Sequence, residues 1–242
     1  MERTQTRPVT PRTAVVWAAL RAEIERGESL MVIDVGGGTG GFAVPLAEAG
    51  HRVTVVDASP DALAALTRRA AEAGVAGRIT AVQGDGDRLA ELVPPGCADL
   101  ILCHSLLEVV DDPAEVVAAL AATLKPGGAA SVLVANRAAA VLSRAMGGHL
   151  AAAAAALADP DGRTGPTDKL RRRFDAEGAA ALLRAAGLTV ESVHGVRVVA
   201  DLLPGAVADD DPEALLAFEL AAADRAPYRD IATQLHLYAR RS

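Results

Sequence analysis

The stretch VIDVGGGTGGFAVPLAEAGHRVTVVDAS, residues 32–59, decides the fold. It begins with a hydrophobic strand and continues into a loop, residues 36–41, in which five of the six residues are glycine. A helix that closes at Gly50 and a second strand that ends in Asp57 follow. Glycine lets the backbone approach a ligand closely, and the N–H groups at the start of a helix point at anions. The stretch therefore predicts a site for a nucleotide or cofactor.

The same alternation continues beyond this stretch. Strands are expected at RITAVQGD (78–85), ADLILCHS (98–105) and AASVLVAN (129–136), with a turn at residues 125–128. Ser59-Pro60 and Asp112-Pro113 mark helix starts, because a capping side chain followed by proline favours the first helical turn. Alternating strands and helices predict an α/β fold with a mostly parallel sheet and helices on both faces.

The pattern changes after residue 136. An alanine-rich helical insertion is expected at about 137–175, and long insertions of this kind are often functional lids. A helix at 175–186, a strand at LTVESVHGVRVVADLL (188–203), a helix at 212–225 and a last strand at IATQLHLYARR (231–241) complete the chain. We expect residues 1–11 to form a mobile N-terminal end and residues 12–242 to form one domain.

Composition limits the classes of function. The 242 residues are 51% hydrophobic and carry a net charge of −7, which suits one compact domain and disfavours a general nucleic-acid surface. The only dense basic run is Arg171–Arg173, for which we expect a solvated turn. Cys97 and Cys103 lie too far apart along a strand to pair, which indicates two buried thiols in a reducing compartment. No secretory signal or membrane-spanning run is evident, so we expect a cytoplasmic protein.

The glycine loop fits two kinds of cofactor. The spacing Gly36-x-Gly38-x-x-Gly41 fits a dinucleotide site, whereas Gly36-x-Gly38-x-Gly40 fits a methyl-donor site. Asp34 lies two residues before the loop, where its carboxylate would repel a pyrophosphate but attract a cationic amino-acid end. This carboxylate favours the methyl donor.

Acidic residues follow the next two strands. Asp57, with its neighbour Ala58, ends the second strand and can hold both ribose hydroxyls of either cofactor. Asp85 follows the third strand, and Asp87 is expected to cap the next helix. One of these two carboxylates can accept a hydrogen bond from an adenine amine, which suits a single nucleoside.

The motifs VIDVGGGTGG, VVDAS, VQGD and LKPGG resemble the class I S-adenosylmethionine-dependent methyltransferases. The resemblance implies a Rossmann-like seven-stranded sheet whose last strand is antiparallel. PRTAVVW, HSLLEVVDDP, HGVRVVADLL and PEALLAFELAAADRAPY are similar to the tRNA 5-carboxymethoxyuridine methyltransferases, which esterify a carboxylate on a wobble uridine.

The resemblance also implies roles for individual residues. Arg12 would bind the cofactor's carboxylate, Gly36 and Gly37 its amino-acid end, and Asp57 its ribose. Asp85 and Gly86 would contact the base, and His104 would close the pocket beside the sulfonium. The expected cofactor site is Arg12, Asp34, Gly36, Gly37, Gly38, Gly40, Asp57, Ala58, Asp85, Gly86, Asp87 and His104.

The presumed substrate half departs from that family. Its tyrosine before Asn136 is Ala135 here, and a histidine and a tyrosine are replaced by Ala200 and Leu202. Asn136 is expected to orient the acceptor or to cap a loop. Arg197, which is expected within a strand of valines, would grip an acceptor carboxylate or form a salt bridge with Asp201 or Glu108. The expected substrate residues are Asn136, Arg197 and Asp201.

The expected chemistry needs few catalytic groups. A carboxylate is already ionised at pH 7, so its methylation needs no general base, whereas a hydroxyl or amine of high pKa needs one. No nucleophilic triad and no metal-ligand spacing stands out. The sequence thus predicts a methyltransferase that uses S-adenosylmethionine on a small-molecule or tRNA carboxylate. The alternatives are an O- or N-methyltransferase of an unrelated metabolite, and a non-catalytic nucleoside or dinucleotide binder.

Overall fold

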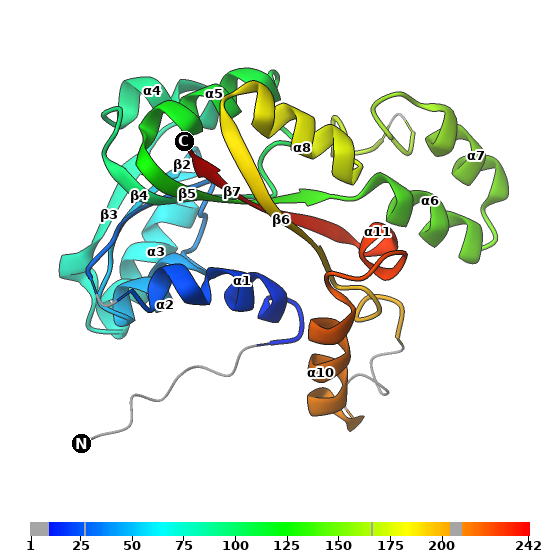
Figure 1. Ribbon diagram of the computed structural model, residues 1–242, viewed down its shortest axis with the longest axis horizontal. Helices are drawn as coiled ribbons and strands as arrows, with labels where there is room; N and C mark the ends of the chain where they lie inside the picture. The colour runs from blue at the N-terminus through cyan, green and yellow to red at the C-terminus, as the bar shows by residue number, and fades with distance from the viewer. Residues whose placement is uncertain (1–9, 27, 166, 204–209) are drawn as a thin grey trace.

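The computed structural model describes residues 10–26, 28–165, 167–203 and 210–242, and its centre is a seven-stranded sheet (Figure 1). The strands are β1 (Met31–Val35), β2 (Arg52–Asp57), β3 (Ile79–Gln83), β4 (Ala98–His104), β5 (Leu124–Ala135), β6 (Leu188–Val196) and β7 (Gln234–Arg241). Their order is β3-β2-β1-β4-β5-β7-β6, and β7 runs antiparallel to both of its neighbours. This confirms the predicted α/β fold with an antiparallel last strand.

Helices cover both faces of the sheet (Figure 1). On one face lie α1 (Ala14–Ile24), α2 (Ala43–Glu48) and α3 (Pro60–Glu72), and on the other α4 (Leu89–Leu92), α5 (Pro113–Thr123) and α8 (Ala176–Ala185). The pair α6 (Arg137–Met146) and α7 (Leu150–Ala158) follows β5, and α10 (Pro212–Ala222) and α11 (Tyr228–Ile231) lie between β6 and β7 in the chain. Within the described ranges, none of the helices has the length and apolar character needed to span a bilayer.

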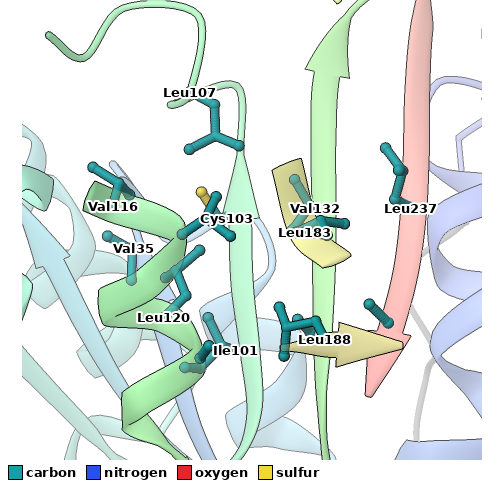
Figure 2. Close-up of a cluster of buried hydrophobic side chains, with 14 of the residues drawn as sticks. Val35, Ile101, Cys103, Leu107, Val116, Leu120, Val132, Leu183, Leu188 and Leu237 are labelled. Atoms are coloured by element: carbon teal, nitrogen blue, oxygen red, sulfur yellow. The ribbon is translucent and has the colours of Figure 1, made fainter. Parts of the chain in front are cut away.

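The core has two layers, because successive strand residues point to opposite faces. Ile101 and Cys103 of β4 pack towards α5 and α8, where Leu120 and Leu183 are also buried (Figure 2). Leu102, which lies between these two residues in β4, packs on the other face with residues of α1 to α3. A central parallel strand buried on both faces explains why ADLILCHS reads as a continuous apolar run.

The predicted starts of α3 and α5 are confirmed. The Ser59 hydroxyl accepts the Ala62 N–H at 3.2 Å, and Pro60 is the first helical residue. Asp112 caps α5 by accepting the Ala114 N–H at 2.8 Å. Both helices therefore begin where side-chain chemistry satisfies otherwise free backbone donors.

Three local expectations were wrong. The expected turn at residues 125–128 is a bulge within β5, since the pairing with β4 shifts register there. The expected strand 188–203 ends at Val196, so Arg197 lies beyond it with a φ of +60°. Cys103 is buried as expected, but Cys97 precedes β4 and is only half-buried.

The expectation of a solvated turn for the basic run 171–173 holds for Arg171, which is exposed, but not for Arg172 and Arg173, which are partly buried. Arg171 pairs with Asp111, and the Arg172 guanidinium donates to the carbonyls of Leu107, Val110 and Asp111. Arg173 forms a largely buried ion pair with Asp168 at 2.5 Å. Arg171 and Arg172 therefore join the segment after α7 to the loop after β4, whereas Arg173 pairs within its own segment. Of the expected mobile end, residues 1–9 lie outside the described part of the chain.

Candidate functional site

The glycine loop follows β1 on the side of the sheet where the carboxyl ends of the parallel strands meet. Gly36, Gly38 and Gly40 have φ values of +73°, +54° and +78°, a region that side chains with a Cβ rarely adopt. The Gly36 N–H donates to the carbonyl of Val56 at 2.8 Å, which fixes the loop against β2. The loop conformation therefore requires glycine at these positions.

Gly37 needs to be glycine for a different reason. A Cβ on Gly37 would lie 2.5 Å from Oδ2 of Asp34 and 2.9 Å from Cγ1 of Val55. Both neighbours are buried residues of strands. The loop thus passes as close to the Asp34 carboxylate as a backbone can.

Asp34 is a buried acid next to the loop, with 3% of its surface exposed. Among the described residues, none donates a hydrogen bond to its carboxylate. Burial, with a further contribution from the charge of Asp57, raises the pKa of Asp34 to about 7. An ionised, buried carboxylate without a partner is unfavourable, so this position suits a cationic ligand group.

Asp57 braces the glycine loop from the end of β2. Its Oδ2 accepts the Gly38 N–H at 2.8 Å and its Oδ1 accepts the Ser59 N–H at 2.9 Å. Each carboxylate oxygen has a second lone pair, so the same group can still accept from a ribose. Ala58, beside it, is exposed.

Replacing Asp57 with alanine should weaken the binding of S-adenosylhomocysteine, a stable nucleoside probe, at least tenfold. The variant loses the acceptor for the ribose and the brace on Gly38, and hydrogen bonds to a charged group contribute about 1.5–3 kcal/mol. Calorimetric titration measures the change, with Asp61→Asn on the exposed start of α3 as the control. Unchanged affinity would remove Asp57 from the site.

The residues after β3 form a short 3-10 turn, Gly86–Arg88. Asp85 is exposed and Gly86 is buried. The expected cap by Asp87 was wrong, since the structure has no side-chain cap at this turn or at α4, which follows it. Asp85, next to the buried glycine, stays the better candidate of the two for a base contact.

Leu106 is a member of this site that sequence reasoning missed. A Cβ on Gly86 would lie 2.9 Å from its Cδ2, and a Cβ on Gly36 would lie 3.4 Å from its Cδ1. The Leu106 side chain therefore lies against both Gly36 and Gly86. Its position two residues after the last residue of β4 was the available signal.

His104, the last residue of β4, is next to the start of α2. Its ring packs edge-on against Phe42 at 4.7 Å, and Phe42 stacks on Trp17 of α1 at 4.8 Å. Its Nε2 lies 2.9 Å from the Ser131 hydroxyl, while its Nδ1 is buried without a partner among the described residues. Burial lowers the pKa of His104 to about 4, so the ring is neutral at pH 7.

Arg12, Arg197 and Asp201 meet in one cluster. Asp201 lies 3.3 Å from Nη1 of Arg197 and 3.8 Å from Nη2 of Arg12. Of the two partners that the sequence suggested for Arg197, the structure has Asp201 and not Glu108. The expected cofactor residue Arg12 therefore joins the two expected substrate residues.

A buried carboxylate holds the segment that carries Arg197 and Asp201. Glu219 of α10 is fully buried and accepts the N–H groups of Val198, Val199 and Ala200 at 2.8–2.9 Å. The backbone after β6 is thus fixed by a side chain that lies 22 residues further along the chain from Arg197. No local sequence signal pointed to Glu219.

Asn136 and Glu108 lie at the end of β5. The Asn136 amide donates to the carbonyls of Asp230 and Ala232 and its oxygen accepts the Ala138 N–H, so its groups hold backbone in this structure. Glu108 is buried, and its Oε1 accepts the Ala135 N–H at 3.0 Å. Desolvation raises the pKa of Glu108, whose Oε2 has no partner among the described residues. In the sequence, Glu108 was a candidate only as a partner for Arg197.

Comparisons with known proteins point to methyltransferases. The family model "Methyltransferase domain" matches residues 32–128, which contain the glycine loop and the acids after β1 to β3. The chain is 31% identical over 234 residues to a tRNA 5-carboxymethoxyuridine methyltransferase of Escherichia coli, covering 95% of this chain and 88% of that one. It is 38% identical over 168 residues to a ubiquinone biosynthesis O-methyltransferase of Xylella fastidiosa, and the match covers 69% of this chain and 63% of that one. A solved S-adenosylmethionine-dependent methyltransferase of Mesorhizobium loti superposes with a TM-score of 0.66 at 25% identity, and the match covers 94% of this chain and 98% of that one.

Proposed function

We propose a function from one premise: this chain belongs to the S-adenosylmethionine-dependent methyltransferase family and uses that cofactor as its methyl donor. The open question is the acceptor. The proposal is that the acceptor is a carboxylate, which the enzyme converts to a methyl ester.

The residues at the carboxyl ends of β1, β2 and β3 fit the cofactor. Asp34 presents a buried carboxylate to which no described residue donates a hydrogen bond, and this suits the ammonium of the amino-acid end. Asp57 ends β2 with spare acceptor capacity for ribose hydroxyls, and Asp85 follows β3 at the position for the base. When bound there, S-adenosylmethionine supplies an electrophilic methyl group on a sulfonium.

The observation that carries the carboxylate proposal is the convergence of two guanidinium groups on one acid. Arg197 and Arg12 both face Asp201, and Arg197 sits in a strained left-handed conformation that Glu219 keeps in place. Arginine in such a fixed fork binds a carboxylate in bidentate fashion. The acceptor's carboxylate joins this cluster, and Asp201 orients the Arg197 guanidinium.

Positioning is then the main task of the chain. The acceptor is ionised at pH 7 and needs no base. The rate acceleration therefore comes from holding its oxygen in line with the methyl group. The Trp17–Phe42–His104 stack excludes water beside β4, and exclusion of water strengthens the attraction between an anionic oxygen and a cationic centre.

Two sources of the carboxylate are consistent with the relatives: a carboxymethoxyuridine of tRNA, and a free metabolite. Arg172 and Arg173 make contacts within the protein, so only Arg171 of the dense basic run is exposed to an RNA backbone. In either case we expect a cytoplasmic enzyme, where tRNA, metabolites and reduced thiols coexist.

The assay incubates the enzyme with methyl-labelled S-adenosylmethionine and, in separate arms, tRNA that contains 5-carboxymethoxyuridine and a small-molecule extract. Methyl esters release labelled methanol in alkali, whereas ethers and N-methyl groups do not. We expect alkali-labile label, and nucleoside mass spectrometry of the tRNA arm identifies the source. Label that is entirely stable to alkali contradicts the proposal.

Replacing Arg197 with lysine should raise the KM for the carboxylate acceptor at least tenfold and change kcat little. Lysine keeps the charge but loses the planar fork, and it removes a charged hydrogen bond of about 1.5–3 kcal/mol. Steady-state kinetics on the labelled acceptor measure the change. The control is Arg184→Lys, on the exposed surface of α8, which should leave both constants unchanged.

A further inference from the structure

Four polar side chains form a row across neighbouring strands on the α1 face of the sheet. In the register of the sheet, His104 of β4 pairs with Leu133 of β5, which pairs with His236 of β7, which pairs with His194 of β6. Ser131 lies two residues before Leu133 and shares its face. The row leads from the carboxyl end of β4 to the outer strand of the sheet.

The row is hydrogen-bonded from one end to the other. Nε2 of His104 lies 2.9 Å from the Ser131 hydroxyl, which lies 2.8 Å from Nε2 of His236. Nδ1 of His236 lies 3.4 Å from Nδ1 of His194, and the two rings stack with centroids 5.6 Å apart. Ser131 and His236 are fully buried, whereas His194 is half-buried beside Asp224 and Arg229.

One hydroxyl between two imidazoles couples their tautomers. Ser131 has a single proton, so it donates to one ring and accepts from the other. Nδ1 of His104 is buried without a partner among the described residues, and a buried orphan lone pair is tolerated better than a buried orphan N–H. The favoured direction is therefore donation from His104 to Ser131, from Ser131 to His236, and from His236 to His194.

We propose that this row is a proton relay, through which the enzyme also methylates a hydroxyl acceptor, with Nδ1 of His104 taking the hydroxyl proton. The inference rests on methyl transfer itself and not on the carboxylate acceptor proposed above. It adds a second class of oxygen acceptor, one whose pKa lies above neutral and which needs a base.

The step balances without any further reagent. The acceptor oxygen forms its bond to the methyl carbon while the bond from that carbon to sulfur breaks, and the electron pair stays on sulfur. The hydroxyl proton moves to Nδ1 of His104, whose Nε2 proton moves to Ser131, whose own proton moves to Nε2 of His236. The Nδ1 proton of His236 moves to His194, which releases a proton from Nε2 to solvent, so every ring stays neutral.

The first test reads the tautomers without any acceptor. In ¹⁵N-histidine-labelled protein with S-adenosylhomocysteine bound, we expect His104 to be protonated on Nε2 and His236 on Nδ1. Ser131→Ala should shift the Nε2 resonances of both rings, and Ser131→Thr, which keeps the hydroxyl, should restore them. A proton on Nδ1 of His104 in the wild type overturns the relay.

The second test uses 4-hydroxyphenylacetate, which carries a phenol and a carboxylate on one small molecule. With labelled S-adenosylmethionine, the alkali-stable methyl ether reports the relay, and the alkali-labile ester reports the carboxylate proposal. We expect ether formation to fall at least tenfold in Ser131→Ala and to recover in Ser131→Thr, with ester formation unchanged. Absence of ether, or ether formation that is unchanged in Ser131→Ala, overturns the relay, whereas absence of ester bears only on the carboxylate proposal.

Discussion

Replacing Gly37 with alanine is expected to weaken binding of S-adenosylhomocysteine more than a hundredfold and to lower the free energy of unfolding by about 1–3 kcal/mol. The added Cβ would lie 2.5 Å from Oδ2 of Asp34 and 2.9 Å from Cγ1 of Val55. Both contacts are far inside van der Waals range, and both neighbours are buried strand residues. The loop must therefore move away from the position at which we propose that it meets the cofactor.

Gly41→Ala is the matched control, because it lies in the same loop. A Cβ there meets no atom within 4 Å, and the residue is not among those with a positive φ. We expect its affinity and its free energy of unfolding to stay within about 0.5 kcal/mol of the wild type. Calorimetric titration and urea denaturation measure the two quantities. Equal behaviour of the two variants would mean that the loop does not hold the ligand.

Replacing Asp34 with asparagine is expected to stabilise the protein above pH 7 and to impair cofactor binding. Burial raises the pKa of Asp34 from 3.8 to about 7, so the folded protein binds a proton that the unfolded chain releases between these values. The free energy of unfolding therefore falls as pH rises from about 4 to about 7, and it stays reduced above pH 7. Asparagine resembles the protonated acid and carries no such dependence.

The difference in unfolding free energy between Asp34→Asn and the wild type isolates this group, since buried histidines such as His104 act in the opposite direction over the same pH range. We expect the difference to grow in favour of the variant by about 2–3 kcal/mol between pH 5 and pH 8. Urea denaturation at both values measures it, with Asp61→Asn as the exposed control. A difference in unfolding free energy that does not change with pH would show that burial does not raise the pKa of Asp34.

The same variant should bind S-adenosylhomocysteine at least tenfold more weakly at pH 8, because the neutral amide no longer attracts an ammonium group. A variant that is more stable yet binds less is the expected sign of a residue kept for function at a cost in stability. Tighter binding by Asp34→Asn would contradict the assignment.

The cofactor half of the site follows largely from local sequence. A strand that ends in an acid, a glycine loop and a helix can fold in few ways, so Asp34 and Asp57 could be proposed from their spacing, whereas the role of Gly37 came from the family resemblance. The close approach of Gly37 to Asp34 could not be predicted, because it depends on the side-chain packing of β2 against β1.

The other half depends on contacts between distant parts of the chain. Arg197 was expected inside a strand because valines surround it, yet β6 ends at Val196 and Glu219 captures the following N–H groups. The histidine row could not be predicted from the sequence either, because it depends on the register of four strands and on the insertion of β7 beside β5. His194 and His236 show no metal-ligand spacing in the sequence, which indicates only structural or exposed residues.

The most direct test of the account is a crystal structure of the protein with S-adenosylhomocysteine. The account predicts that the nucleoside lies across the ends of β1, β2 and β3, with its ammonium at Asp34, its ribose hydroxyls on Asp57 and its base beside Asp85 and Gly86. A nucleoside bound elsewhere, or one whose ribose makes no contact with Asp57, would contradict it.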